Sequence, residues 1–168
     1  MANPFIGREP TLEDLWRAIV LYGRNVASYK FALASSLLEL RPEEGDLVTL
    51  EDLSGPFSRH LMTHLARADK QATSPSSKFL DALRMGLAGE LSEQQVIEQT
   101  TRLGFVNVID AFHVVGSGDV PERFFLDERA QNGGIRITED FSRLAAGAQI
   151  GRNSVGPGCQ PHTPPRIA

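Results

Sequence analysis

His60 and His64 have the spacing that most directly suggests metal chemistry. They stand four positions apart in a segment with helical periodicity, so both imidazoles can point from one helix face toward a single metal ion. A hydrolytic zinc centre also needs a third ligand and a general base, which zincins place between the two histidines. Leu61, Met62 and Thr63 fill those positions here. The two histidines are metal candidates on spacing alone, and we expect neither a bound metal nor a cofactor.

Asp110 and His113 form a second polar pair, set inside an apolar run. Three positions apart on a helix they would touch, and the carboxylate could fix the imidazole tautomer as in a general-base pair. No serine or cysteine can be assigned as their nucleophile. Two interpretations follow: a small cytosolic enzyme centred on this pair, or a core histidine satisfied by ordinary hydrogen bonds.

A polar and aromatic cluster lies between the first two predicted helices: Arg24, Asn25, Tyr29 and Lys30. Cations on adjacent helical turns could hold phosphates, with the amide or the phenol adding hydrogen bonds. The same residues could instead form a buried polar network that fixes the pairing of the two helices. They are our candidates for binding nucleic acid or a partner protein.

The charge balance bears on these candidates. The 168 residues include 17 Lys and Arg against 21 Asp and Glu, a net charge of −4, which weighs against a free-standing nucleic-acid binder. The single cysteine, Cys159, excludes an internal disulfide framework and a Cys-based zinc site. No apolar run approaches the ~20 residues of a membrane span, and residues 1–8 lack a secretory pattern. We therefore expect a cytoplasmic protein that does not bind membranes.

Apolar residues at helical spacing predict about six helices and a mostly α domain. The first predicted helix places Leu12, Trp16 and Ile19 on one apolar face. Three helices are predicted to begin at a capping pair, Thr11 with Asp14, Thr49 with Asp52, and Ser92 with Gln95. Pro42 is predicted to end the second helix, and Gly55-Pro56 to break or kink the third. The fourth helix is predicted to start at Ser74-Pro75 and to end at Gly89. A last helix is predicted over residues 139–146, with Gly147 at its end.

The C-terminal third is expected to contain a small β-hairpin. Residues 123–126 and 135–137 are short β-like runs, and the glycines before the second run favour a turn. Residues 105–115 are apolar without a clear period and could form a buried strand or a buried helix. The preceding helix and this hairpin could also form a winged helix-turn-helix, although acidic neighbours argue against it. Its wing contacts would be Arg123, Arg129 and Arg136.

The composition changes abruptly near the end of the chain. Residues 147–168 include four glycines and four prolines but no acidic residue. This composition predicts a disordered tail, with a frameshifted or truncated end as an alternative origin. The sequence thus predicts a multi-helical domain over residues 3–146 with a small β-hairpin near its C-terminal end, followed by a flexible tail over residues 147–168. It does not predict the oligomeric state.

Three stretches of the chain resemble one protein family. They are Leu15-Trp16-Arg17-Ala18-Ile19 leading into residues 22–34, then Lys78-Phe79-Leu80-Asp81, then residues 104–113 followed by Pro121 and Arg123-Phe124-Phe125. Together they are similar to the N-terminal helical region of bacterial HNH-endonuclease-family proteins, and the resemblance covers roughly residues 3–146. In that family a C-terminal HNH module carries the nuclease chemistry.

The resemblance implies a role without implying catalysis. An HNH site needs a histidine base, an adjacent Asn or Asp, and a further histidine on a divalent metal, and the only histidine after residue 146 is His162. No catalytic residue is therefore carried over, and the chain is not expected to be active alone. The resemblance implies a helical domain that recognises nucleic acid or a nuclease module. A protein–protein interaction module with an apolar helix face is the alternative.

Overall fold

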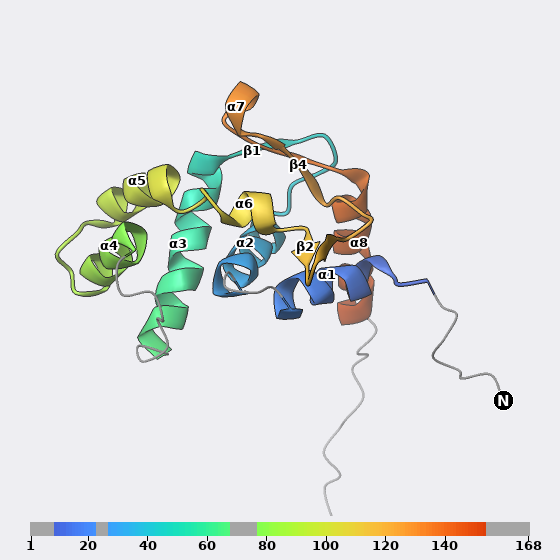
Figure 1. The fold of residues 1–168 in the computed structure, drawn as a ribbon, viewed down its shortest axis with the longest axis horizontal. Helices are drawn as coiled ribbons and strands as arrows, with labels where there is room; N and C mark the ends of the chain where they lie inside the picture. Colours follow the sequence, from blue (N-terminus) through green and yellow to red (C-terminus); the bar gives the residue numbers. More distant parts are fainter. Residues whose placement is uncertain (1–8, 23–26, 68–76, 154–168) are drawn as a thin grey trace, which may run out of the picture.

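The computed structural model describes residues 9–22, 27–67 and 77–153, which form a mostly helical fold with two small antiparallel sheets (Figure 1). The helices are α1 (Leu12–Tyr22), α2 (Ala27–Leu40), α3 (Leu50–Arg67), α4 (Lys78–Leu87), α5 (Glu93–Leu103), α6 (Val108–Ala111), α7 (Arg129–Asn132) and α8 (Glu139–Asn153). The strands are β1 (Leu47–Thr49), β2 (Val114–Val115), β3 (Gly118–Asp119), β4 (Phe125–Glu128) and β5 (Gly134–Ile137).

The helices are arranged in two groups on opposite sides of a central pair. Helices α3, α4 and α5 lie together at one end in Figure 1, and α1 and α8 lie at the other, with α2 and α6 between them. One sheet has the order β1-β5-β4, and β2 pairs with β3 in the other. No helix in the described part of the chain combines the length and the apolar character that crossing a membrane requires.

The three predicted capping pairs are confirmed. At the start of α1, the Asp14 N–H donates to Thr11 Oγ1 at 3.2 Å and the Thr11 N–H donates to Asp14 Oδ2 at 3.0 Å. The same reciprocal bonds join Thr49 with Asp52 before α3, and Ser92 with Gln95 before α5. These starts were predictable because each pair is local in sequence and satisfies backbone donors that a helix cannot satisfy itself.

Helix α3 continues through Gly55-Pro56 instead of ending there. A proline inside a helix removes one backbone hydrogen bond, and its ring clashes with the Cβ of the residue before it. The residue before Pro56 is Gly55, which has no Cβ, so the clash with a Cβ does not arise. Leu53, Phe57 and Leu61 recur every four residues on both sides of the proline and are fully or nearly fully buried. Their packing favours one continuous helix.

Two other helix boundaries differ from the predicted ones. Helix α4 begins after Ser77, whose side chain accepts the Leu80 N–H at 3.4 Å, whereas Ser74-Pro75 lies outside the described residues. Helix α8 passes Gly147 and ends at Asn153, so the prediction that it stops at residue 146 is wrong. One glycine costs a helix only about 1 kcal/mol, which the rest of a 15-residue helix offsets. The remainder of the predicted tail, residues 154–168, lies outside the described residues.

The predicted hairpin is confirmed as β4 paired with β5, with α7 forming its connection. A third strand, β1, joins the far edge of β5 and was not predicted, because its three residues are too short to show a pattern. Residues 105–115 combine both expected forms, a four-residue helix (α6) and a two-residue strand (β2).

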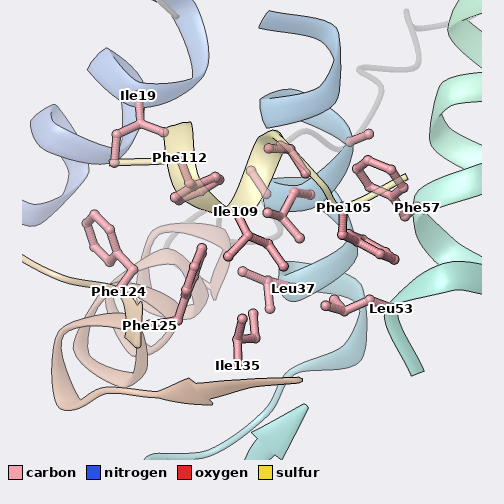
Figure 2. Close-up of a cluster of buried hydrophobic side chains, with 14 of the residues drawn as sticks. Ile19, Leu37, Leu53, Phe57, Phe105, Ile109, Phe112, Phe124, Phe125 and Ile135 are labelled. Carbon is pink, nitrogen blue, oxygen red and sulfur yellow. The ribbon is translucent and has the colours of Figure 1, made fainter. Parts of the chain in front are cut away.

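The core is centred on aromatic rings from distant parts of the chain. The Trp16 ring lies 5.6 Å from Phe112, 4.9 Å from Phe124 and 5.8 Å from Phe141, measured between ring centroids. Figure 2 shows Phe112, which directly follows α6, between Ile19 of α1 and the β4 side of the core. The predicted apolar face of the first helix therefore packs inward, and the Trp16 ring of α1 contacts rings that follow α6, precede β4 and belong to α8.

Replacing Trp16 with alanine should lower the free energy of unfolding by about 3–5 kcal/mol, because the indole is 9% exposed and contacts three rings. Chemical denaturation of the purified variant measures this change. Val106→Ala is the control, since Val106 is 57% exposed and should cost less than about 0.5 kcal/mol. A Trp16→Ala variant as stable as the control would show that α1 does not pack as described.

Gly134 should not tolerate a side chain. A Cβ at this position in β5 would overlap the Val48 carbonyl oxygen and lie 2.8 Å from the Thr49 Cα, both backbone atoms of β1. Gly134→Ala should therefore destabilise the fold by about 1–3 kcal/mol, measured by thermal or chemical unfolding. Gly118→Ala is the matched control, because a Cβ there meets no atom within 4 Å. Equal stability of the two variants would contradict the β1–β5 pairing.

Candidate functional site

Lys30 of α2 is the most unusual functional-type residue in the structure. Its side chain is 1% exposed, and its Nζ donates to the Val114 carbonyl oxygen of β2 at 2.5 Å. Within the described residues this is the one hydrogen bond or ion pair of the amine. Lys30 was predicted to belong to a phosphate- or partner-binding cluster. In the structure it instead joins α2 to β2 inside the protein.

Burial lowers the pKa of the Lys30 amine, because an ammonium ion loses its hydration without gaining a carboxylate partner among the described residues. The long aliphatic part of the side chain packs as an apolar group, and the amine needs only a hydrogen-bond acceptor at its tip. The Val114 carbonyl supplies that acceptor. The arrangement is that of a buried polar tether between two elements.

His113 directly precedes Val114 of β2, which accepts the Lys30 hydrogen bond, and is 3% exposed. Its ring contacts Phe112, Phe124 and Phe125, with centroid distances of 5.2, 6.2 and 4.8 Å. Its Nε2 accepts the backbone N–H of Phe124 at 3.1 Å, so in the neutral ring the proton is assigned to Nδ1. Burial lowers the pKa of His113 to about 4; the charges of Arg123 and Lys30 also lower this pKa, and Asp119 opposes them.

Asp110 does not partner His113. The Asp110 carboxylate is exposed and accepts from Arg129 Nη2 at 2.7 Å. Arg129 also binds Asp127 at 2.7 Å and the Phe105 carbonyl oxygen at 3.1 Å. Helix α6 ends at Ala111, so the chain leaves the helical path before His113 and the spacing rule no longer applies. The predicted general-base pair is not formed.

The predicted binding cluster is divided by the fold. Arg24 and Asn25 lie outside the described residues. Tyr29 is half-buried, and its ring lies 6.2 Å from Phe57 and 6.0 Å from Phe79, in the aromatic group of α3 and α4. Burial raises the pKa of the Tyr29 phenol, outweighing the opposite effects of Ser77 and Arg84. Neighbouring positions on a helix point about 100° apart, so Tyr29 and Lys30 serve different contacts.

The three arginines of the winged-helix interpretation all have acidic partners. Arg123 pairs with Asp119, and Arg129 pairs with two aspartates as described above. Arg136 binds Glu128 at 2.8 Å and also donates to the Gly45 carbonyl oxygen at 2.9 Å. These ion pairs neutralise charges that a nucleic-acid-binding wing would direct at phosphates.

The two histidines of α3 also have different environments. His60 Nε2 lies 3.0 Å from Glu39 Oε2, and the same carboxylate binds Arg59 at 2.7 Å. His64, one turn further along, is exposed. Over residues 9–22, 27–67 and 77–153, no group of three or more His, Cys, Asp or Glu side chains is placed to hold a metal ion. The spacing of the two histidines alone therefore identifies no metal site in this part of the chain.

Sequence reasoning missed a set of exposed apolar side chains at the junction of α1 and α2. Leu21 and Tyr22 end α1 with 68% and 69% exposure, and Phe31 of α2 is 53% exposed. Leu21 falls outside the predicted apolar face of the first helix, and this mismatch was the signal that could have identified it. We call these three residues the junction residues.

Comparison of the chain with protein-family models, with curated proteins and with solved structures gave no match.

The depressed pKa of His113 makes a pH-dependent prediction. Because the folded pKa of about 4 lies below the ordinary 6.5, the unfolded chain takes up the proton first as pH falls. The contribution of His113 to stability is thus fully present above pH 6.5 and is lost as pH falls through 4. The full difference corresponds to about 3 kcal/mol in the free energy of unfolding.

Urea unfolding at pH 7 and pH 4 of the wild type and of His113→Gln tests this expectation. The glutamine amide oxygen can reach the position of Nε2 and accept the Phe124 N–H, but glutamine does not titrate. The wild type should lose about 3 kcal/mol more than the variant over this range, with the carboxylates common to both cancelling. Parallel pH profiles would show that the imidazole is not held neutral in the core.

Proposed function

We propose that this chain is a non-catalytic helical recognition domain of an HNH nuclease-like protein, and that it binds a partner protein through the junction residues. The observation that carries the proposal is the exposure of Leu21, Tyr22 and Phe31, which the core does not use. Large apolar side chains left in water are the usual anchors of protein interfaces.

The position of the junction residues supports the nuclease connection. Tyr22 and Phe31 belong to the stretch in which the resemblance to HNH-endonuclease-family proteins is densest. Leu21 and Tyr22 precede residues 23–26, and Phe31 follows them by little more than one helical turn.

A protein partner is favoured over nucleic acid because the candidate basic side chains are buried or paired with acids. Lys30 is buried and Arg123, Arg129 and Arg136 are paired with acids, so none of the four presents a free charge to a phosphate backbone. Nucleic-acid binding depends on such charges, and the chain carries a net charge of −4. Burying an exposed large apolar side chain contributes about 1.5–3 kcal/mol. The three junction residues would thus be the centre of a larger interface.

An affinity capture from the source cell, with bound proteins identified by mass spectrometry, tests the proposal. The wild-type chain should retain a protein that carries an HNH module. The double variant Tyr22→Ser/Phe31→Ser should lose that protein at least tenfold, because two anchors are removed. Leu126→Ser is the matched control: Leu126 is 50% exposed on β4, away from the junction, and its variant should retain the partner.

Two results would contradict the proposal. One is retention of the HNH protein to the same extent by the double variant and the wild type. The other is tight binding of labelled duplex DNA that depends steeply on salt, which would assign the domain to nucleic-acid recognition.

A further inference from the structure

His113 closes a loop that contains the small hairpin of β2 and β3. Its carbonyl oxygen accepts the Val120 N–H at 2.8 Å, and its ring Nε2 accepts the Phe124 N–H at 3.1 Å. One residue before β2 thus binds the residue after β3 and the residue before β4. We call residues 113–120 the hairpin segment, and β2 within it lies beside α1 (Figure 1).

The bond to Phe124 and a protonated ring exclude each other. A neutral imidazole has one N–H and one lone pair, and the Phe124 N–H occupies the lone pair of Nε2. A second proton can be added only at that same nitrogen. The imidazolium would then direct an N–H at the Phe124 N–H, so that two donors face each other. Proton uptake by His113 therefore requires the ring and residue 124 to separate.

The surrounding charges oppose an imidazolium in the closed loop. Lys30 of α2 and Arg123, just before β4, are cations that disfavour a charged ring. Asp119 of β3 favours it but is itself paired with Arg123. Among the described residues these three are the charges that act on the ring, and burial adds to the two cations. A protonated His113 is therefore stabilised by moving toward water.

Residue 124 is held in place from its other side. The Thr138 N–H donates to the Phe124 carbonyl oxygen at 3.3 Å, and the Thr138 hydroxyl donates to the Arg123 carbonyl oxygen. The hairpin segment has fewer such contacts, because β2 and β3 contain two residues each and residues 116–119 are exposed. Segments with few buried groups open at a lower cost than the whole fold. The hairpin segment is thus the part that can move.

We infer that His113 is a proton-operated latch: uptake of one proton by its ring releases the hairpin segment from residue 124 while the rest of the fold stays intact. The release opens the β2 side of the aromatic core, where the Trp16 ring lies 4.9 Å from Phe124 and 5.6 Å from Phe112. Acid would thereby expose an apolar surface that is covered at neutral pH. This device does not depend on the junction residues or on the proposed nuclease partner.

The test is a pH titration of the ¹⁵N-labelled full chain, followed by NMR and by the fluorescence of Trp16, the single tryptophan. The Phe124 amide should lose its protection from hydrogen exchange in a one-proton transition near pH 4, the pKa of His113. Trp16 emission should move to longer wavelength in the same transition. The Ile137 amide of β5, which donates to the Asp46 carbonyl oxygen at 2.9 Å, reports global unfolding and should stay protected.

Variants assign the transition to the His113 ring. His113→Gln should remove it, because glutamine offers an acceptor that takes up no proton. Arg123→Gln should move the midpoint to higher pH and Asp119→Asn to lower pH, because the first charge opposes the imidazolium and the second favours it. Arg102→Gln is the matched control for loss of an exposed arginine. Arg102 lies on α5 at the far end of the fold, so its variant should leave the midpoint unchanged (Figure 1).

Three results would overturn the inference. They are the same transition in a folded His113→Gln, loss of Phe124 protection only together with that of Ile137, and midpoints that move in one direction in both charge variants. Arg123 and Asp119 are exposed and their variants keep His113, so these two shifts decide the question even if the glutamine variant does not fold.

Discussion

Residues 105–115 cross between the two ends of the protein, and the backbone polar groups of their buried part must be satisfied away from water. Only six of these eleven residues lie in α6 or β2, so the segment cannot satisfy all of those groups by itself. The Phe105 carbonyl accepts from Arg129, the His113 carbonyl accepts from the Val120 N–H, and the Val114 carbonyl accepts from Lys30. Two of the protein's cations are therefore used on this one stretch of backbone.

The need to satisfy buried backbone polar groups explains why the candidate site residues are held in structural hydrogen bonds. Lys30 and Arg129 have the side-chain types of a phosphate-binding site, and His113 that of a catalytic base. Each is held in a structural contact, and the His113 ring adds an acceptor for the otherwise buried Phe124 N–H. The junction residues have no such structural contact, and their large apolar side chains face outward.

Local features of the fold were predictable from sequence, and features that depend on distant partners were not. Capping pairs such as Thr11 with Asp14 involve residues three apart, and the inward face of Trp16 follows from helical periodicity. Asp110 finds its partner 19 residues away, and β1 becomes a strand only because β5 is beside it. The helical class was therefore correct, whereas the candidate catalytic pair was not formed.

The bond between Lys30 and Val114 also has a consequence for how the chain emerges from the ribosome. The two residues are separated by 84 positions, so at about 5–20 residues per second the lysine is made roughly 4–17 s before its acceptor. During that interval the amine has no Val114 carbonyl to meet and stays hydrated. The α2 helix can form early from local contacts, but its lysine can reach its acceptor only after residue 114 has been synthesised. Enclosure of the Lys30 side chain is thereby delayed until that segment has emerged.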